Sequence, residues 1–424
     1  MPTEQPSLLG VLRVVERIAP SAPGLTDLPQ AISSALDGLA MPAGTLHGKR
    51  IAVGIGSRGI ASIDVLAREL CRWLKDHGAR PFVFPAMGSH GGATAEGQRK
   101  VLEHYGITPD FLGADVLSSM DTVSLGSTPE DFQVFMDRAA WESDGVILLN
   151  RVKPHTDFSG KIESGLLKMI AVGMGKADGA LECHHWSWKF GFEPVIRAVS
   201  RKVLATGKIL AGVGVVENEF HQVAEVRAAS ASGIVAMEEA CLAIARGLVA
   251  RIPFPKLDLL IVNELGKNIS GTGLDTKIVG RGVELQPGDA PQIRLIYARD
   301  LTAESAGNAL GVGLADAIHE RLYHKIDLQK MYANARTSMN PPMPRIPIFW
   351  PSDEQAIGWL LGALGSPEPA EQRVAWIRNT LNLNRIAVSE LLARDAENLP
   401  GWRLLPEPFE SAFDDAGNLP SSPV

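Results

Sequence analysis

The length and composition of the chain indicate a compact globular protein with more than one domain. It has 424 residues, of which 45% are hydrophobic and 21% are charged. These values are close to those of soluble globular proteins and unlike those of disordered or fibrous chains. The formal charge of -7 arises from 48 acidic and 41 basic residues, without a basic block of the kind that follows a phosphate backbone. Nucleic acid is therefore not an expected partner.

The cysteine content and the apolar runs limit the cellular compartments in which the protein is expected. Cys71, Cys183 and Cys241 are far apart and form no CxxC pair, so they predict neither a disulfide framework nor a structural zinc site. The N-terminal stretch has an early acidic residue and arginines inside its apolar part, unlike a secretory signal. The longest apolar runs are strand-sized, well below the roughly 20 residues that cross a bilayer. We expect a cytoplasmic protein without a membrane partner.

The first half of the chain alternates strand and helix patterns. Apolar residues at helical spacing fill 63–74, and Thr94 with Glu96 suits the start of a helix over 95–105. Strands are predicted at 50–54, 81–84, 145–149 and 209–216. This alternation predicts an α/β fold with a mainly parallel sheet covered by helices.

A second domain is predicted after the proline-bracketed stretch IPFP, which follows a helix over 233–251. The predicted domains are 1–254, a catalytic and cofactor-binding domain, and 255–424, an α/β domain with a helical tail. We expect each to hold a mainly parallel sheet, with the active site in the cleft between them. The elements expected in the second domain are strands at 257–262, 292–297 and 346–350, helices at 305–324, 353–364 and 371–381, and a disordered-looking end.

Two glycine-containing loops follow the first two predicted strands. The first, GIGSRG at 54–59, places Arg58 where open α/β sheets bind ligands, and its guanidinium could hold a carboxylate with two parallel bonds. The second, GSHGGAT at 88–94, suits an anionic group at the start of the following helix and directs His90 to the same cleft. Surface-loop and loop-bracing roles are the alternatives.

A third motif, NRVKPHTDFSG, follows the strand at 145–149 and contains His155. A racemase needs two bases, because the hydroxyl groups of two enantiomers lie on opposite faces of the reacting carbon. His90 and His155 meet that requirement.

The run from Lys168 to His185 is the fourth motif. Lys168 stands among apolar residues, and buried lysines are rare without a partner or a function. His184 and His185 are adjacent, so their side chains diverge and one metal ligand is expected from the pair. Imidazole suits nickel, copper and zinc alike. A helix-terminal pair bonded to the backbone is the alternative.

Taken together, these motifs resemble the lactate racemase family, over about residues 50–185 and more loosely beyond. The spacing from Lys168 to His184, with Gly173 in register, carries the resemblance. It implies a nickel-pincer nucleotide (pyridinium-3,5-bisthiocarboxylic acid mononucleotide), with His184 as the nickel ligand and Lys168 beside the cofactor. His90 and His155 are the implied bases and Arg58 the implied substrate-carboxylate ligand. The other implied cofactor contacts are Ser57, Gly91, Gly92 and Gly173.

The resemblance also implies an activity and partners. It predicts an isomerase that inverts C2 of a 2-hydroxy acid by internal hydride transfer, and cofactor-synthesis proteins as partners in maturation. Leu166 and Leu167 stand where glycines are usual, so Lys168 is expected to join the cofactor covalently or as an ion pair, with Lys161 as the alternative. Ile55 stands where an acidic residue is expected, so one cofactor or substrate contact is expected to be absent or supplied elsewhere.

Lys267 or Lys277 of NELGKNISGTGLDTK could complete the carboxylate clamp in the second domain. Two other classes of function stay open. One is a zinc-dependent hydrolase or hydratase built around His184, although the chain has no HExxH motif. The other is a non-catalytic nucleotide-binding protein of the same fold.

Overall fold

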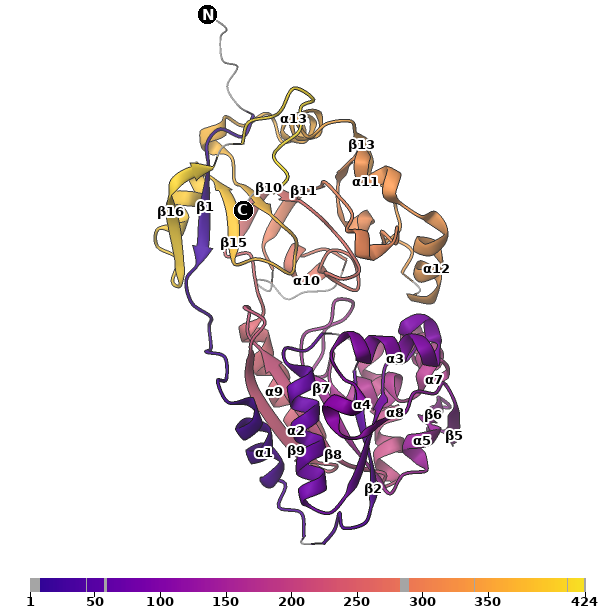
Figure 1. The fold of residues 1–424 in the computed structure, drawn as a ribbon. Coiled ribbons are helices and arrows are strands. Elements are labelled where there is room, and N and C mark those ends of the chain that lie inside the picture. Colours follow the sequence, from indigo (N-terminus) through magenta and orange to yellow (C-terminus); the bar gives the residue numbers. More distant parts are fainter. Residues whose placement is uncertain are drawn as a thin grey trace, which may run out of the picture. The chain divides into compact units, whose positions relative to one another are not determined.

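The computed structural model describes residues 8–42, 44–56, 59–282, 290–338, 340–409 and 411–422. The chain divides into two compact units (Figure 1). The first unit comprises residues 22–155 and 159–249. The second unit comprises residues up to Ser21, 156–158 and 250–424.

The N-terminal strand belongs with the second unit, whereas the sequence-based division had placed all of 1–254 in the first domain. This strand, β1 (Leu12–Arg17), pairs antiparallel with β15 (Arg385–Ser389) and β16 (Trp402–Phe409). Pairing with two C-terminal strands is the physical reason for the correction.

The first unit contains a six-stranded sheet. Its neighbouring strands are parallel except for the last pair, which is antiparallel. The order is β4 (Asp115–Val116), β3 (Arg80–Pro85), β2 (Arg50–Ile55), β7 (Gly145–Arg151), β8 (Ile209–Glu217) and β9 (Val223–Ser230). A separate antiparallel pair is formed by β5 (Thr122–Ser127) and β6 (Gln133–Asp137).

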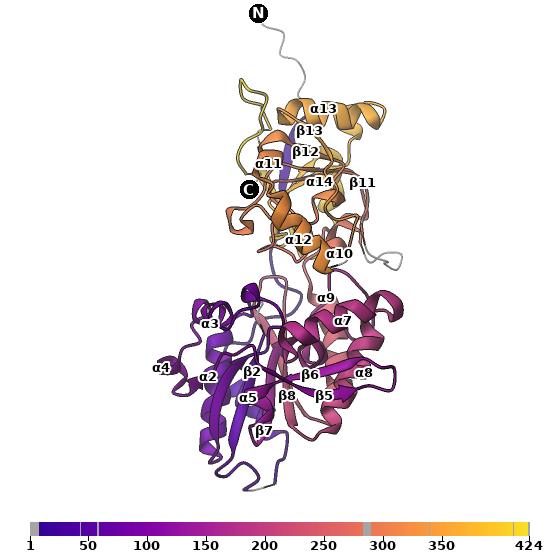
Figure 2. The same ribbon diagram turned by 90° about the vertical axis from the view of Figure 1, so that its right-hand side faces the viewer.

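Helices cover both faces of this sheet (Figure 2). On one face, Val53 of β2 packs in the same buried cluster as Leu36 and Leu70, and on the other Val216 packs with Leu242. The helices are α1 (Leu28–Asp37), α2 (Ile63–Asp76), α3 (Ala95–His104), α4 (Pro109–Leu112), α5 (Arg138–Trp141), α6 (Leu166–Lys168), α7 (Lys176–Phe190), α8 (Phe192–Ala205) and α9 (Ile234–Leu248), with a 3-10 turn η1 (Gly91–Ala93) and a π-helical turn η2 (Met169–Gly173). The predicted mainly parallel, helix-covered sheet is confirmed.

The second unit contains an eight-stranded sheet, whose first five strands are parallel and whose last three run antiparallel to their neighbours. Its order is β13 (Ile348–Trp350), β12 (Ala317–His319), β11 (Gln292–Ala298), β10 (Lys256–Val262), β14 (Val374–Ile377), β15, β1 and β16. Its helices and turns are α10 (Thr276–Val279), η3 (Ala303–Ser305), η4 (Val312–Leu314), α11 (Glu320–Lys325), α12 (Leu328–Ser338), α13 (Asp353–Ala363), η5 (Pro369–Glu371) and α14 (Glu390–Ala396).

Two helices predicted in the second unit are wrong. The stretch 305–324 breaks into short turns, β12 and α11, because Gly311 adopts φ 99° where a Cβ would lie 1.5 Å from Thr272 O. The stretch 371–381 contains β14 instead, because the four residues Val374–Ile377 are buried on both faces of the sheet between β10 and β15.

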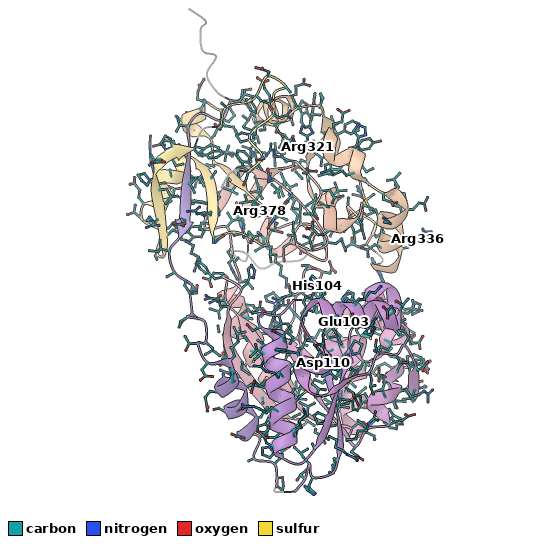
Figure 3. All side chains as sticks on the ribbon, viewed as in Figure 1. Glu103, His104, Asp110, Arg321, Arg336 and Arg378 are labelled. Carbon is teal, nitrogen blue, oxygen red and sulfur yellow. The ribbon has the colours of Figure 1, made fainter. Side chains whose placement is uncertain are left out.

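The C-terminal segment is fixed by a buried ion pair, although its composition had suggested disorder. Arg299 donates to Asp353 at 2.7 Å, and both side chains are almost fully buried. Arg299 also donates to Leu419 O, while Leu419 N donates to Asp353 at 2.9 Å. Arg321, labelled in Figure 3, donates to the same carboxylate at 3.2 Å. Among the described residues, none of the helices has the length and apolar character to cross a membrane.

Candidate functional site

Neighbouring strands of the first unit bring three of the predicted motifs to one edge of the sheet. β2 lies between β3 and β7, and parallel strands open their carboxyl-terminal loops on the same side. His90 follows β3, and His155 follows β7. Ser57 and Arg58, which follow β2, lie outside the described residues, so their roles stay predictions.

A direct contact joins Lys168 and His155. Lys168 Nζ and His155 Nε2 share a hydrogen bond, and both side chains are half-buried. Lys168 ends α6 and is followed directly by the π-helical turn η2. Such turns are rare in proteins overall, and those that occur are often at functional sites. Lys161, the alternative cofactor lysine, is exposed. The structure therefore brings together the lysine and one base that were predicted from separate motifs.

His184 lies on α7 beside the same residues. Its ring packs edge-on against Phe192 with centroids 5.5 Å apart, and the His155 ring lies 6.3 Å from the same phenyl ring. Burial, and next the positive charge of Lys168, lower the pKa of His184 to about 4. Its buried Nδ1 has no hydrogen-bond partner in the described part of the chain. His184 is therefore a neutral imidazole at neutral pH.

The chemistry of His184 suits a metal ligand. Metals bind the neutral form of imidazole, and nickel is among those that imidazole suits. A buried polar atom without a hydrogen-bond partner is uncommon in folded proteins. His185 is exposed, with its ring against Trp186, so the two histidines point into different surroundings. Over the residues that the structure describes, no group of three His, Cys, Asp or Glu side chains is placed to hold a metal ion.

The loop after β3 places His90 at the surface beside two glycines. Gly91 and Gly92 adopt φ of 64° and 67°, which favour glycine. A Cβ on Gly91 would lie 2.6 Å from the Gly97 backbone, whereas a Cβ on Gly92 would meet no described atom within 4 Å. Thr94 then caps α3 by accepting from Gly97 N at 3.0 Å, as predicted. The backbone beside Gly92 is open to a ligand, and cofactor contact there stays a prediction.

Lys176, which no sequence motif singled out, braces this loop from the start of α7. Its fully buried ammonium group donates to Gln98 Oε1 at 3.1 Å and lies 3.1 Å from the Asp137 carboxylate. Gln98 donates in turn to Gly88 O at 2.8 Å and His90 O at 3.3 Å. Burial lowers the pKa of Lys176, and Asp137 opposes this shift. The sequence offered one weak signal, a lysine between small residues in GMGKADG.

Gly173 joins the Lys168 segment to the same loop. Its carbonyl oxygen accepts from Gly88 N at 3.0 Å. A Cβ at this position would lie 2.4 Å from Ala86 O, so only glycine permits the close approach. Its predicted contact with a cofactor stays a prediction.

The two predicted second-unit lysines follow β10. Lys267 Nζ donates to Gly271 O, and its backbone N donates to Ser305 Oγ at 2.9 Å. Lys277 belongs to α10, and its backbone N donates to Asp275 at 3.0 Å. Both side chains are half-buried. A substrate clamp completed by either lysine, and an active site in a cleft between the units, stay predictions.

Comparison with known proteins gives a likeness to solved structures, without a match in sequence. No protein-family model matches the chain, and no curated protein matches it in sequence. Among solved structures, the chain is similar to the lactate racemase apoprotein from Thermoanaerobacterium thermosaccharolyticum. The two are 16% identical with a TM-score of 0.46, over 90% of this chain and 86% of that chain. At that level of similarity, function has to be argued from the residues of this chain.

Proposed function

We propose that this chain is a racemase or epimerase of 2-hydroxy acids that holds a nickel-pincer nucleotide between Lys168 and His184. The observation that carries the proposal is the grouping of these two residues with His155. Lys168 contacts the imidazole predicted as a base, and its charge acts on the imidazole predicted as the nickel ligand. His155 comes from one sequence motif and Lys168 and His184 from another, and Lys168 acts on both histidines.

The cofactor and the chain would divide the work. When bound, the nickel-pincer nucleotide supplies a ring that accepts hydride from C2 of the substrate and returns it. His184 would supply the protein ligand to nickel through its neutral ring. Lys168 would hold an anionic arm of the cofactor, by an ion pair or a covalent bond. Ser57, Gly91, Gly92 and Gly173 are the remaining proposed cofactor contacts.

Two histidines would handle the proton of the substrate hydroxyl group. His155 would accept it at Nε2 for one enantiomer, and His90 would do so for the other. Lys168 Nζ, which lies at this Nε2, would turn to the cofactor and leave the nitrogen to the substrate. Arg58, with Lys267 or Lys277, would hold the substrate carboxylate.

The test is nickel content after co-expression with cofactor-synthesis proteins. We expect stoichiometric nickel and a pincer absorption band in the wild-type protein, and loss of both in His184→Ala. His185→Ala is the matched control, because its exposed ring has no proposed role, and it should load like the wild type. Equal nickel in His184→Ala, or stoichiometric zinc without nickel in the wild type, would contradict the proposal.

A further inference from the structure

Helix α9 lies outside all the predicted motifs, yet two of its side chains reach the segment that carries Lys168 and His155. They are Glu238, which is fully buried, and Arg246, which is partly exposed. Eight residues separate them, so they stand roughly 12 Å apart along the helix axis. A straight helix can therefore hold two points of this segment at a fixed spacing.

Glu238 holds the turn directly before Lys168. Its Oε2 accepts from Leu167 N at 2.8 Å. Gly165, which directly precedes α6, passes so close that a Cβ there would lie 2.4 Å from Glu238 Oε1. Asn150, at the end of β7, holds the other side by donating to Gly165 O at 2.9 Å. The start of α6 is thus fixed between α9 and the sheet.

Arg246 holds the backbone of His155 through one intermediate residue. It donates to Glu163 Oε1 at 2.6 Å, and Glu163 is fully buried. The other oxygen, Oε2, accepts from His155 N at 2.5 Å. Arg246 also donates to Gly160 O in the intervening loop. Arg246 of α9 therefore compensates the negative charge of Glu163, the residue that holds the backbone of His155.

We infer that α9 sets the contact between Lys168 and His155, with Glu238 and Arg246 as positioning residues. Glu238 acts through the backbone of the turn before Lys168, and Arg246 acts through Glu163 and the backbone of His155. The role in catalysis rests on the proposed function, since that function gives Lys168 and His155 their tasks. The geometric claim can be measured on the full chain without cofactor.

The test is a cycle of variants read by NMR of ¹⁵N-labelled histidine rings, with the His155 signal assigned from His155→Gln. Lys168→Met removes the hydrogen-bond partner of Nε2 and should move its resonance in the wild-type background. We expect the same substitution to move it less than half as far in Arg246→Met or Glu238→Ala. Loss of stability alone would not change the response of the folded protein.

Matched controls and conservative variants complete the cycle. Arg201→Met changes an exposed arginine of α8. Glu239→Gln changes the residue next to Glu238, and it is Glu239 that pairs with Arg197. Both should leave the Lys168→Met response at its wild-type size, and Arg246→Lys and Glu238→Gln should restore much of it. If Glu238→Ala does not fold, the Arg246 pair carries the test. An undiminished response in Arg246→Met would overturn the inference.

Failure of this inference and failure of the proposed function give different results. In the loaded enzyme, Arg246→Met should lower kcat with little change in KM, because substrate binding is assigned to other residues. A reduced NMR response together with a wild-type protein that inverts no hydroxy acid would leave α9 in its role and reject the proposed function. Wild-type activity together with an undiminished NMR response would reject the role of α9 and leave the proposed function in place.

Discussion

The ammonium group of Lys176 donates to the side chain of Gln98 at 3.1 Å, although 78 positions separate the two residues. Gln98 passes this link to the carbonyl oxygens of Gly88 and His90. Since Lys176 opens the helix that carries His184, two buried side chains connect the predicted metal ligand to the loop of one predicted base.

Replacing Lys176 should destabilise the first unit strongly. Lys176→Met leaves the buried carboxylate of Asp137 without its cation, which costs about 3–5 kcal/mol in comparable cases. The free energy of unfolding in urea measures this loss. Lys189→Met, at the exposed end of the same helix, is the control and should cost little.

A second substitution checks the cause. Adding Asp137→Asn to Lys176→Met removes the stranded charge and should recover part of the stability. Asparagine can keep the cap that Asp137 provides to Ala140 N at 2.9 Å. If the double variant is no more stable than Lys176→Met, the buried charge is not the source of the loss.

Removing the last seven residues should destabilise the second unit. A chain that ends at Gly417 loses Leu419, which donates to Asp353 and accepts from Arg299. Burial would raise the pKa of Asp353, yet the bonds from Arg299 and then Tyr297 hold that pKa below its usual range. We expect a loss of about 2–4 kcal/mol in the free energy of unfolding, from lost hydrogen bonds to a charged pair and lost burial of Leu419. A chain that ends at Ser422 keeps these contacts, and an equal loss there would contradict the account.

Stability should depend on pH through Glu238. Burial raises the pKa of Glu238 to about 7 from a usual value of 4.5. The folded state therefore disfavours the ionised carboxylate, and its stability falls as pH rises from about 4.5 to about 7. Relative to the wild type, Glu238→Gln should gain stability across this range, by up to about 3 kcal/mol above pH 7. Unfolding free energies at several pH values measure it, and a pH-independent difference would count against the buried charge.

Nickel binding should resist acid. Because burial and Lys168 lower the pKa of His184 to about 4, protons compete for this imidazole only near that pH. Loaded protein dialysed at a series of pH values from about 8 down to 5 should therefore keep its nickel. Loss of nickel already near pH 6.5, the ordinary pKa of histidine, would contradict a nickel ligand in the buried surroundings of His184.

Local patterns predicted the alternating part of the fold. The helical spacing of Leu66 and Leu70, and the Thr94 cap, are properties of a few neighbouring residues, and α2 and α3 follow them. The same patterns placed His90 and His155 after separate strands of a mainly parallel sheet, and the carboxyl ends of parallel strands lie on one side.

The rest depends on partners far along the chain. Glu16 of β1 pairs with Arg385, 369 positions away. The sequence near Glu16 does not indicate which strand β1 pairs with. Likewise, the partner of Lys176 is the carboxylate of Asp137, and the partner of Glu238 is the backbone amide of Leu167. Neither partner can be identified from the sequence around the residue that it meets. The structure of β1, β14 and the tail is decided by such contacts, and these segments are among those that the sequence-based predictions missed.

The central claim is tested most directly by following the C2 hydrogen in heavy water. Protein loaded with its cofactor would be incubated with single enantiomers of a panel of 2-hydroxy acids, and NMR with chiral separation would report inversion and deuterium content. The account predicts that at least one acid is inverted and keeps its hydrogen at C2. Inversion with extensive deuterium at C2, or no inversion of any acid by nickel-loaded protein, would contradict it.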